Sequence, residues 1–148
     1  MPISLVLMHF NLIWGLEILI VILIINAGDA TFAHEDRYSV GNDPASISLG
    51  DFDGDGDLDL AVVHNNVQEN IHLLFNMDGV FVDHQVLQVA GSPRGIDAGD
   101  FDDDGDLDIV VGVNHRGARV LLNRGDGSFD PEQKYLVGGA GQNGDQRH

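Results

Sequence analysis

The chain contains no cysteine, and its 148 residues include only 7 Lys or Arg against 24 Asp or Glu. Without cysteine it can form no disulfide and offers no thiol nucleophile. The formal net charge of −17 argues against a nucleic-acid partner, because proteins that bind nucleic acid need a positively charged surface. We therefore expect a disulfide-free protein that does not bind nucleic acid.

Common catalytic motifs are also missing from the sequence. It has neither a Gly-x-Ser-x-Gly turn nor a phosphate-binding loop, and its histidines lack the spacing of a zinc protease. Pairs of Asp serve glycoside hydrolysis in some enzymes, but here they lie within local loops rather than across a cleft. We predict that the chain is not an enzyme and has no catalytic residue or organic cofactor.

Two acidic loops are the most informative feature that is present. They read Gly-Asp-Phe-Asp-Gly-Asp-Gly-Asp-Leu-Asp-Leu from Gly50 and Gly-Asp-Phe-Asp-Asp-Asp-Gly-Asp-Leu-Asp-Ile from Gly99. Asp at positions one, three and five points carboxylates inward from a curled backbone, Gly at position six permits the turn, and Asp at position nine closes the shell. Oxygen ligands in that number suit Ca²⁺. The predicted side-chain ligands are Asp51, Asp53, Asp55 and Asp59, then Asp100, Asp102, Asp104 and Asp108.

Position seven of each loop completes the predicted metal sites. By analogy with other calcium loops, Asp57 and Asp106 would offer their backbone carbonyls. In the absence of a cation, two carboxylates about 4 Å apart repel by roughly 4 kcal/mol at an effective dielectric near 20, so an empty loop must open. We therefore predict two structural Ca²⁺ sites.

Two other interpretations compete with a calcium loop that leads into strands. Asp and Gly are ordinary turn residues, so the loops could be solvated acidic turns, although both loops match at every ligand position. A helical calcium hand requires Glu at position twelve, where this chain has Val62 and Val111 within β-branched runs. We therefore expect strands over 58–63 and 107–113.

The loops belong to a longer repeat. Asp51 and Asp100 are 49 residues apart, as are Pro44 and Pro93. A second landmark, an apolar run followed by Asn and a turn that ends in Phe, follows each loop and also precedes the first. Its Phe residues stand at 32, 81 and 129, at intervals of 49 and 48 residues. A period of this size with short strands is typical of propeller blades.

One repeat unit contains four expected strands. The first unit places them at 45–49, 58–64, 70–75 and 80–89, with a tight turn at Asp78-Gly79, and the second repeats them from Gly95 to about 137. The predicted fold is all-β, built of four-stranded antiparallel β-propeller blades. It forms an incomplete propeller of about two blades plus the edge of a third.

The acidic loops, each followed by the apolar run, Asn and turn that ends in Phe, resemble the FG-GAP and VCBS repeats found in integrin α-subunit-like β-propellers and in many secreted bacterial proteins. The resemblance covers about residues 20–138 and implies that each blade carries its calcium loop between its first two strands. The corresponding organisation has a hydrophobic segment at 1–25, the end of a preceding repeat at 20–43, one repeat at 44–92, a second at 93–138 and a flexible tail at 139–148.

The number of units raises the question of closure. A closed propeller needs at least four blades, so further blades in the same polypeptide or another copy in trans are expected to complete the ring. We favour the interpretation that the chain is a fragment of a longer protein, with association of copies as the alternative.

The N-terminal segment allows three interpretations. Residues 3–25 are predominantly apolar and about long enough to span a bilayer, which fits a signal peptide or a membrane anchor. Gly28-Asp29-Ala30 and Thr31-Phe32-Ala33 are small-residue cleavage candidates. The end of a preceding repeat, at 20–43, overlaps this stretch, so the third interpretation is that it forms a strand of a preceding blade.

Together these features predict a calcium-binding module of an extracellular or cell-envelope protein, either secreted or membrane-anchored. It would act as a non-catalytic scaffold or adhesion-type surface for a protein or carbohydrate ligand, and millimolar extracellular calcium would fill even weak sites. The alternative is a non-catalytic propeller segment of a secreted enzyme such as a polysaccharide lyase or phospholipase. A membrane-anchored adhesin, in contact with the membrane through residues 3–25, is a third possibility.

Overall fold

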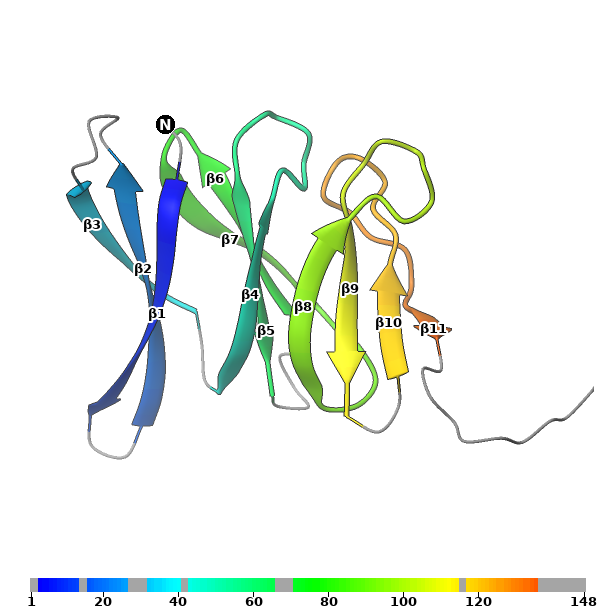
Figure 1. Ribbon diagram of the computed structural model, residues 1–148, viewed down its shortest axis with the longest axis horizontal. Helices are drawn as coiled ribbons and strands as arrows, with labels where there is room; N and C mark the ends of the chain where they lie inside the picture. The colour runs from blue at the N-terminus through cyan, green and yellow to red at the C-terminus, as the bar shows by residue number, and fades with distance from the viewer. Residues whose placement is uncertain are drawn as a thin grey trace, which may run out of the picture.

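The computed structural model describes residues 3–13, 16–26, 32–40, 43–65, 71–114 and 117–135, which form three antiparallel sheets arranged in a row (Figure 1). Every regular element within these ranges is a strand. The same ranges contain no helix that is long and apolar enough to cross a membrane. The predicted tail at 139–148 and the candidate cleavage site Gly28-Asp29-Ala30 lie outside the described residues.

The first sheet is built from the apolar N-terminal segment and the residues after it. Its strands are β1 (Ile3–Ile13), β2 (Leu16–Asn26) and β3 (Phe32–Ser39), paired in the order β1-β2-β3. The stretch that also fits a signal peptide or an anchor thus pairs here as two strands, β1 with β2.

The second and third sheets are the two repeats. The second contains β4 (Pro44–Gly50), β5 (Asp59–His64), β6 (Ile71–Met77) and β7 (Val80–Leu87), paired in that order. The third contains β8 (Pro93–Gly99), β9 (Asp108–Val113), β10 (Gly117–Leu121) and β11 (Gln133–Tyr135), also paired in chain order. The predicted all-β fold of four-stranded antiparallel units, not closed into a ring, is confirmed.

The central sheet is covered on both faces, as its apolar sequence requires. All six residues of β5 are buried. Successive residues of a strand point to opposite faces, so Leu60 and Val62 pack in a cluster with Tyr38 of β3, whereas Ala61 and Val63 pack in the cluster shared with the third sheet. A strand buried on both sides has no polar alternation, which explains the continuous apolar run.

The hairpin between β6 and β7 follows from two residues. Asp78 and Gly79 both have positive φ, +54° and +89°. Two consecutive residues of this kind form the mirror-image turn that suits the twist of paired strands, and Asp-Gly is among the sequences that adopt it most readily. Met77 consequently pairs with Val80 across a two-residue loop, as the sequence predicts.

A common register joins all three sheets. Each contains an Asn that pairs with a Phe across the hairpin that leads to its last strand. The three pairs are Asn26 with Phe32, Asn76 with Phe81 and Asn123 with Phe129. Strands β1, β2 and β3 therefore correspond to the second, third and fourth strands of the two complete units.

Candidate metal sites

The first acidic loop joins β4 to β5 and curls around Asp51. The backbone N–H groups of Gly54 and Gly56 donate to the two carboxylate oxygens of Asp51 at 2.8 and 3.0 Å. Gly54 and Gly56 have φ of +78° and +95°, a backbone conformation that glycine adopts readily because it has no Cβ atom. The glycines therefore allow the tight backbone that the calcium-loop prediction requires.

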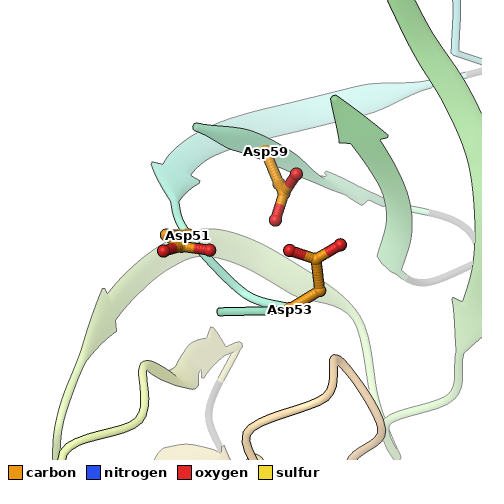
Figure 2. Close-up of side chains that lie close together, drawn as sticks. All are labelled: Asp51, Asp53 and Asp59. Carbon is orange, nitrogen blue, oxygen red and sulfur yellow. The ribbon is translucent and has the colours of Figure 1, made fainter. Parts of the chain in front are cut away.

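Three carboxylates converge in this loop. Asp51, Asp53 and Asp59 each contribute one oxygen, and these oxygens lie within 4.8 Å of one another (Figure 2). Figure 2 shows Asp59 entering from β5, opposite the loop residues Asp51 and Asp53. A group of three carboxylate oxygens offers hard, anionic ligands, and this donor set fits a cation such as Ca²⁺.

Asp59 also has a structural role, and its carboxylate is fully buried. One oxygen accepts from the backbone N–H of Phe52 at 2.8 Å, and the other accepts from the backbone N–H of Asn76 at 2.9 Å. The side chain thus connects the start of the loop, the start of β5 and the end of β6. Its position is fixed by the fold before any cation is considered.

The second loop repeats this arrangement at equivalent residues. Oxygens of Asp100, Asp102 and Asp108 also lie within 4.8 Å of one another. The carboxylate of Asp108 accepts from the backbone N–H groups of Phe101 and Asn123, both at 2.8 Å. Both loops therefore build the same three-carboxylate cluster on the same backbone support.

The other two predicted side-chain ligands, Asp55 and Asp104, lie outside these two clusters, which include only side-chain atoms and so do not test the predicted backbone carbonyls of Asp57 and Asp106. Asp55 accepts a hydrogen bond from the backbone N–H of Asp57 at 2.9 Å, and Asp104 accepts one from that of Asp106 at 2.9 Å. Of the eight predicted side-chain ligands, six thus converge, and the other two bind the backbone of their own turn. Asp106 faces the backbone of Gly125, where a Cβ atom would lie 2.5 Å from a carboxylate oxygen.

The electrostatics of both clusters favour neutralisation. Desolvation raises the pKa of Asp53, and the neighbouring charges of Asp55 and Asp51 raise it further. Burial likewise raises the pKa of Asp59, although its two backbone hydrogen bonds oppose the shift. In the second loop the pKa of Asp102 is raised by desolvation and then by Asp104 and Asp108. Desolvation is the largest cause of these pKa shifts, and a bound cation would remove the smaller contribution that carboxylate repulsion makes to them.

Two asparagines support the clusters, and sequence reasoning gave them no role. The side-chain amide of Asn76 donates to the carbonyl oxygen of Leu58 at 3.3 Å, and its oxygen accepts from Gly79 at 2.8 Å. Asn123 donates to the carbonyl oxygen of Leu107 at 2.9 Å. The signal was available, because an Asn stands at the same place before the turn of each repeat.

Comparison with known families agrees with this geometry. The model of an FG-GAP-like repeat matches residues 51–111 and again 100–146. The chain belongs to the FG-GAP-like repeat family. The two FG-GAP-like matches begin at Asp51 and Asp100, the first residue of each acidic loop, so the family assignment predicted from these strings is confirmed. Searches of curated proteins and of solved structures found no match for the chain.

Proposed function

We propose that this chain is a calcium-binding, non-catalytic β-propeller repeat module that provides a scaffold or interaction surface outside the cell. The observation that carries the proposal is the convergence of Asp51, Asp53 and Asp59, repeated at equivalent residues of the next unit. Exposed acidic groups are common without a cation. Here, however, each cluster includes one fully buried carboxylate that the backbone holds in place.

Calcium fits the donor chemistry of both loops. All the converging atoms are carboxylate oxygens, which favour hard cations, and the loops carry no histidine that would favour zinc or copper. Asp51, Asp53 and Asp59 would hold the first ion, and Asp100, Asp102 and Asp108 the second. Further oxygens of the same loops, including the predicted ligands Asp55, Asp57, Asp104 and Asp106, are close in sequence to complete each shell.

The ion would act on stability rather than on a reaction. It supplies positive charge that offsets the repulsion among three carboxylates. Because Asp59 also binds the backbone of Phe52 and Asn76, tightening the cluster secures the loop against β5 and β6. A cation at a hundred times its dissociation constant would stabilise the folded state by roughly 2.7 kcal/mol per site.

The proposed location is extracellular or in the cell envelope, where calcium is abundant enough to fill such sites. Loops of this kind need not bind calcium tightly where the cation is millimolar, whereas sites in the cytosol must have much higher affinity. The predominantly apolar composition of residues 3–25 fits a signal peptide or a membrane anchor, although these residues pair as strands β1 and β2 in the structure. The ligand of the module would be a protein or carbohydrate bound away from the buried strands.

Calcium titration of the full chain, followed by calorimetry and thermal unfolding, tests the proposal. We expect two sites per chain and a melting temperature that rises with Ca²⁺ more than with equal Mg²⁺. Asp53→Ala and Asp102→Ala should each remove one site. Asp83→Ala, an exposed acidic residue of β7 outside both loops, is the matched control and should leave both sites intact. A melting temperature that does not change with chelator, with calcium or with either loop variant would disprove the proposal.

A further inference from the structure

Both acidic loops lie at the same end of the second and third sheets, together with the turn between β10 and β11, drawn in orange (Figure 1). We call residues 123–129 the Asn123 hairpin, because Asn123 pairs with Phe129 across this turn. The ring of Phe129 meets the ring of Phe52 edge to face, with 6.3 Å between their centroids. A hairpin of the second repeat therefore covers the loop of the first.

Asn123 joins the two loops through hydrogen bonds. Its side-chain amide donates to the carbonyl oxygen of Phe52 in the first loop at 2.8 Å, and to that of Leu107 in the second loop at 2.9 Å. Its backbone N–H donates to the buried carboxylate of Asp108 at 2.8 Å. The backbone N–H of Phe52 in turn donates to Asp59 at 2.8 Å. A continuous path of hydrogen-bonded residues therefore connects the buried carboxylates of the two clusters.

The loops are also in close packing contact. A Cβ atom at Gly50, directly before the first loop, would lie 2.8 Å from Cδ1 of Leu107, so a side chain of the second loop lies on this backbone. A Cβ atom at Gly54 would lie 3.2 Å from the carbonyl oxygen of Gly125 in the Asn123 hairpin. One at Gly125 would lie 2.5 Å from a carboxylate oxygen of Asp106 in the second loop. Because such close packing transmits displacements, neither loop can open without disturbing the contacts of the other.

We infer that the two candidate sites bind Ca²⁺ with positive cooperativity, a property that rests on the calcium binding proposed above. Without a cation, repulsion among the three carboxylates of the first cluster favours an open loop, and Phe52 stands between Asp51 and Asp53 in that loop. Opening would carry the carbonyl of Phe52 away from Asn123, which also holds Asp108 in the second cluster. An ion at either site therefore stabilises the closed form of both loops. By linkage, each ion changes the affinity for the other by the same factor.

Direct electrostatic interaction between the sites acts in the opposite direction. The first ion reduces the negative charge that attracts the second ion, which weakens binding at the other site. Salt screens this effect over about 8 Å at about 0.15 M ionic strength. Positive cooperativity at this ionic strength therefore has its cause in the contacts between the loops and not in the charge of the ions.

Native mass spectrometry of the full chain, titrated with Ca²⁺ in about 0.15 M ammonium acetate, counts the ions bound to each molecule. At half saturation, independent sites leave at least about half of the molecules with one ion, whereas about fivefold coupling lowers this fraction to about a third. We expect the lower fraction in the wild type and a return to about half or more in Asn123→Ala. Asn123→Ser replaces it if Asn123→Ala does not fold, because a hydroxyl has one hydrogen to donate and cannot serve both carbonyls.

Gln85→Ala is the matched control. The Gln85 side chain also binds the Asn123 hairpin, at the carbonyl oxygen of Gly127 and at 2.5 Å, but it comes from β7 and touches neither cluster. Its removal should leave the fraction of singly loaded molecules as in the wild type. Equal fractions in the wild type and the folded Asn123 variant, or equal effects of the Asn123 and Gln85 variants, would overturn the inference. A wild type that binds no calcium would overturn the proposed function as well, so the two failures differ.

Hydrogen exchange measured by NMR tests the path between the loops directly. In Asp53→Ala only the second site binds calcium, so any effect of calcium on the first loop must come through the contacts between them. We expect calcium to slow exchange of the Phe52 backbone N–H at least about fivefold in this variant. The same measurement in Asp53→Ala combined with Asn123→Ala should show no such slowing. An exchange rate at Phe52 that calcium leaves unchanged in Asp53→Ala, with the second site filled, would contradict the coupling.

Discussion

The side-chain amide of Asn123 donates to the carbonyl oxygen of Phe52 at 2.8 Å, joining residues 71 positions apart. The same amide donates to the Leu107 carbonyl, and the backbone N–H of Asn123 donates to Asp108. Phe52 lies between two clustered carboxylates of the first loop, and Asp108 belongs to the cluster of the second. One asparagine therefore connects both candidate metal loops and the two sheets that carry them.

Asn123→Ala should destabilise the protein more than Asn76→Ala. Both substitutions remove a side-chain bond to a carbonyl of the same unit, but only Asn123 also serves a carbonyl of the neighbouring sheet. A buried carbonyl left without its partner costs about 1–3 kcal/mol, which sets the expected difference in free energy of unfolding. Urea denaturation of both variants measures it. Equal losses would show that the bond between sheets adds nothing to stability.

Much of the fold was predictable because it depends on local patterns. The 49-residue spacing, the apolar runs and Asp78-Gly79 predicted the strands and the turn, and the Asp spacing predicted the loops. Which carboxylates converge was less accessible. Asp55 shares the alternating pattern of Asp51 and Asp53, but its side chain instead accepts a hydrogen bond from the backbone of its own turn.

Contacts between sheets were not predictable from one unit. Phe52 and Phe101 stand at identical positions in nearly identical strings, yet Phe52 is buried and Phe101 is exposed. The difference comes from the hairpin at residues 123–129, about 75 positions later in the chain, which covers Phe52. A repeat pattern specifies the surface of each unit, whereas burial depends on which neighbour lies on that surface.

Asp103→Gly should stabilise the second loop. Asp103 has a φ of +63° at the position where the first loop has Gly54 with +78°. A left-handed conformation disfavours a side chain, so replacement by Gly should raise the free energy of unfolding by up to about 1 kcal/mol. Asp103→Asn removes the same charge but keeps a side chain, so it separates the backbone effect from the electrostatic effect in urea denaturation.

The reciprocal substitution in the first loop, Gly54→Asp, should lower the stability of the protein. Gly54→Asp would place a Cβ atom 3.2 Å from the carbonyl oxygen of Gly125, in addition to the backbone strain. We expect a loss of stability larger than the gain from Asp103→Gly. Tolerance of Gly54→Asp without loss, or destabilisation by Asp103→Gly, would contradict the assignment of backbone strain to this loop position.

The clustered carboxylates should make the calcium-free protein more stable as the pH falls toward their ordinary pKa of 3.8. The pKa values of Asp53, Asp59 and Asp102 are raised above 3.8 in the folded state, so folding favours their protonation. The stabilisation is complete below the unfolded pKa and is lost as the pH rises through the raised values. Asp126 acts oppositely, because its hydrogen bonds with Ser128 lower its pKa, but its loss of stabilisation begins only below about 3.8.

Calcium should reverse this pH dependence. Protons compete with the cation for the same carboxylates, so the calcium-induced rise in melting temperature should shrink as the pH falls. Melting curves at about pH 5.5 and about pH 4, below most histidine titration and close to the ordinary carboxyl range, with calcium removed beforehand on a chelating resin and then restored, compare the two cases. A calcium-free melting temperature that drops between these values would show that the clustered carboxylates do not control stability.

Asp59→Ala and Asp53→Ala should separate support of the fold from binding of the ion. Asp59 satisfies the backbone N–H groups of Phe52 and Asn76 in a fully buried position, so its removal leaves two buried donors unpaired, at about 1–3 kcal/mol each. Asp53 lies on the loop beside Asp51 and Asp55, so its removal relieves repulsion in the absence of calcium and loses only one exposed hydrogen bond, which it accepts from the backbone N–H of Asp55 at 3.2 Å. Without calcium, Asp59→Ala should therefore lower the free energy of unfolding while Asp53→Ala leaves it unchanged or higher. With calcium present, both variants should lose the stabilisation that the first site gives the wild type.

Asp108→Ala and Asp102→Ala repeat the comparison in the second loop. If the two variants of either loop had the same free energy of unfolding without calcium, the buried carboxylate would act only as a ligand.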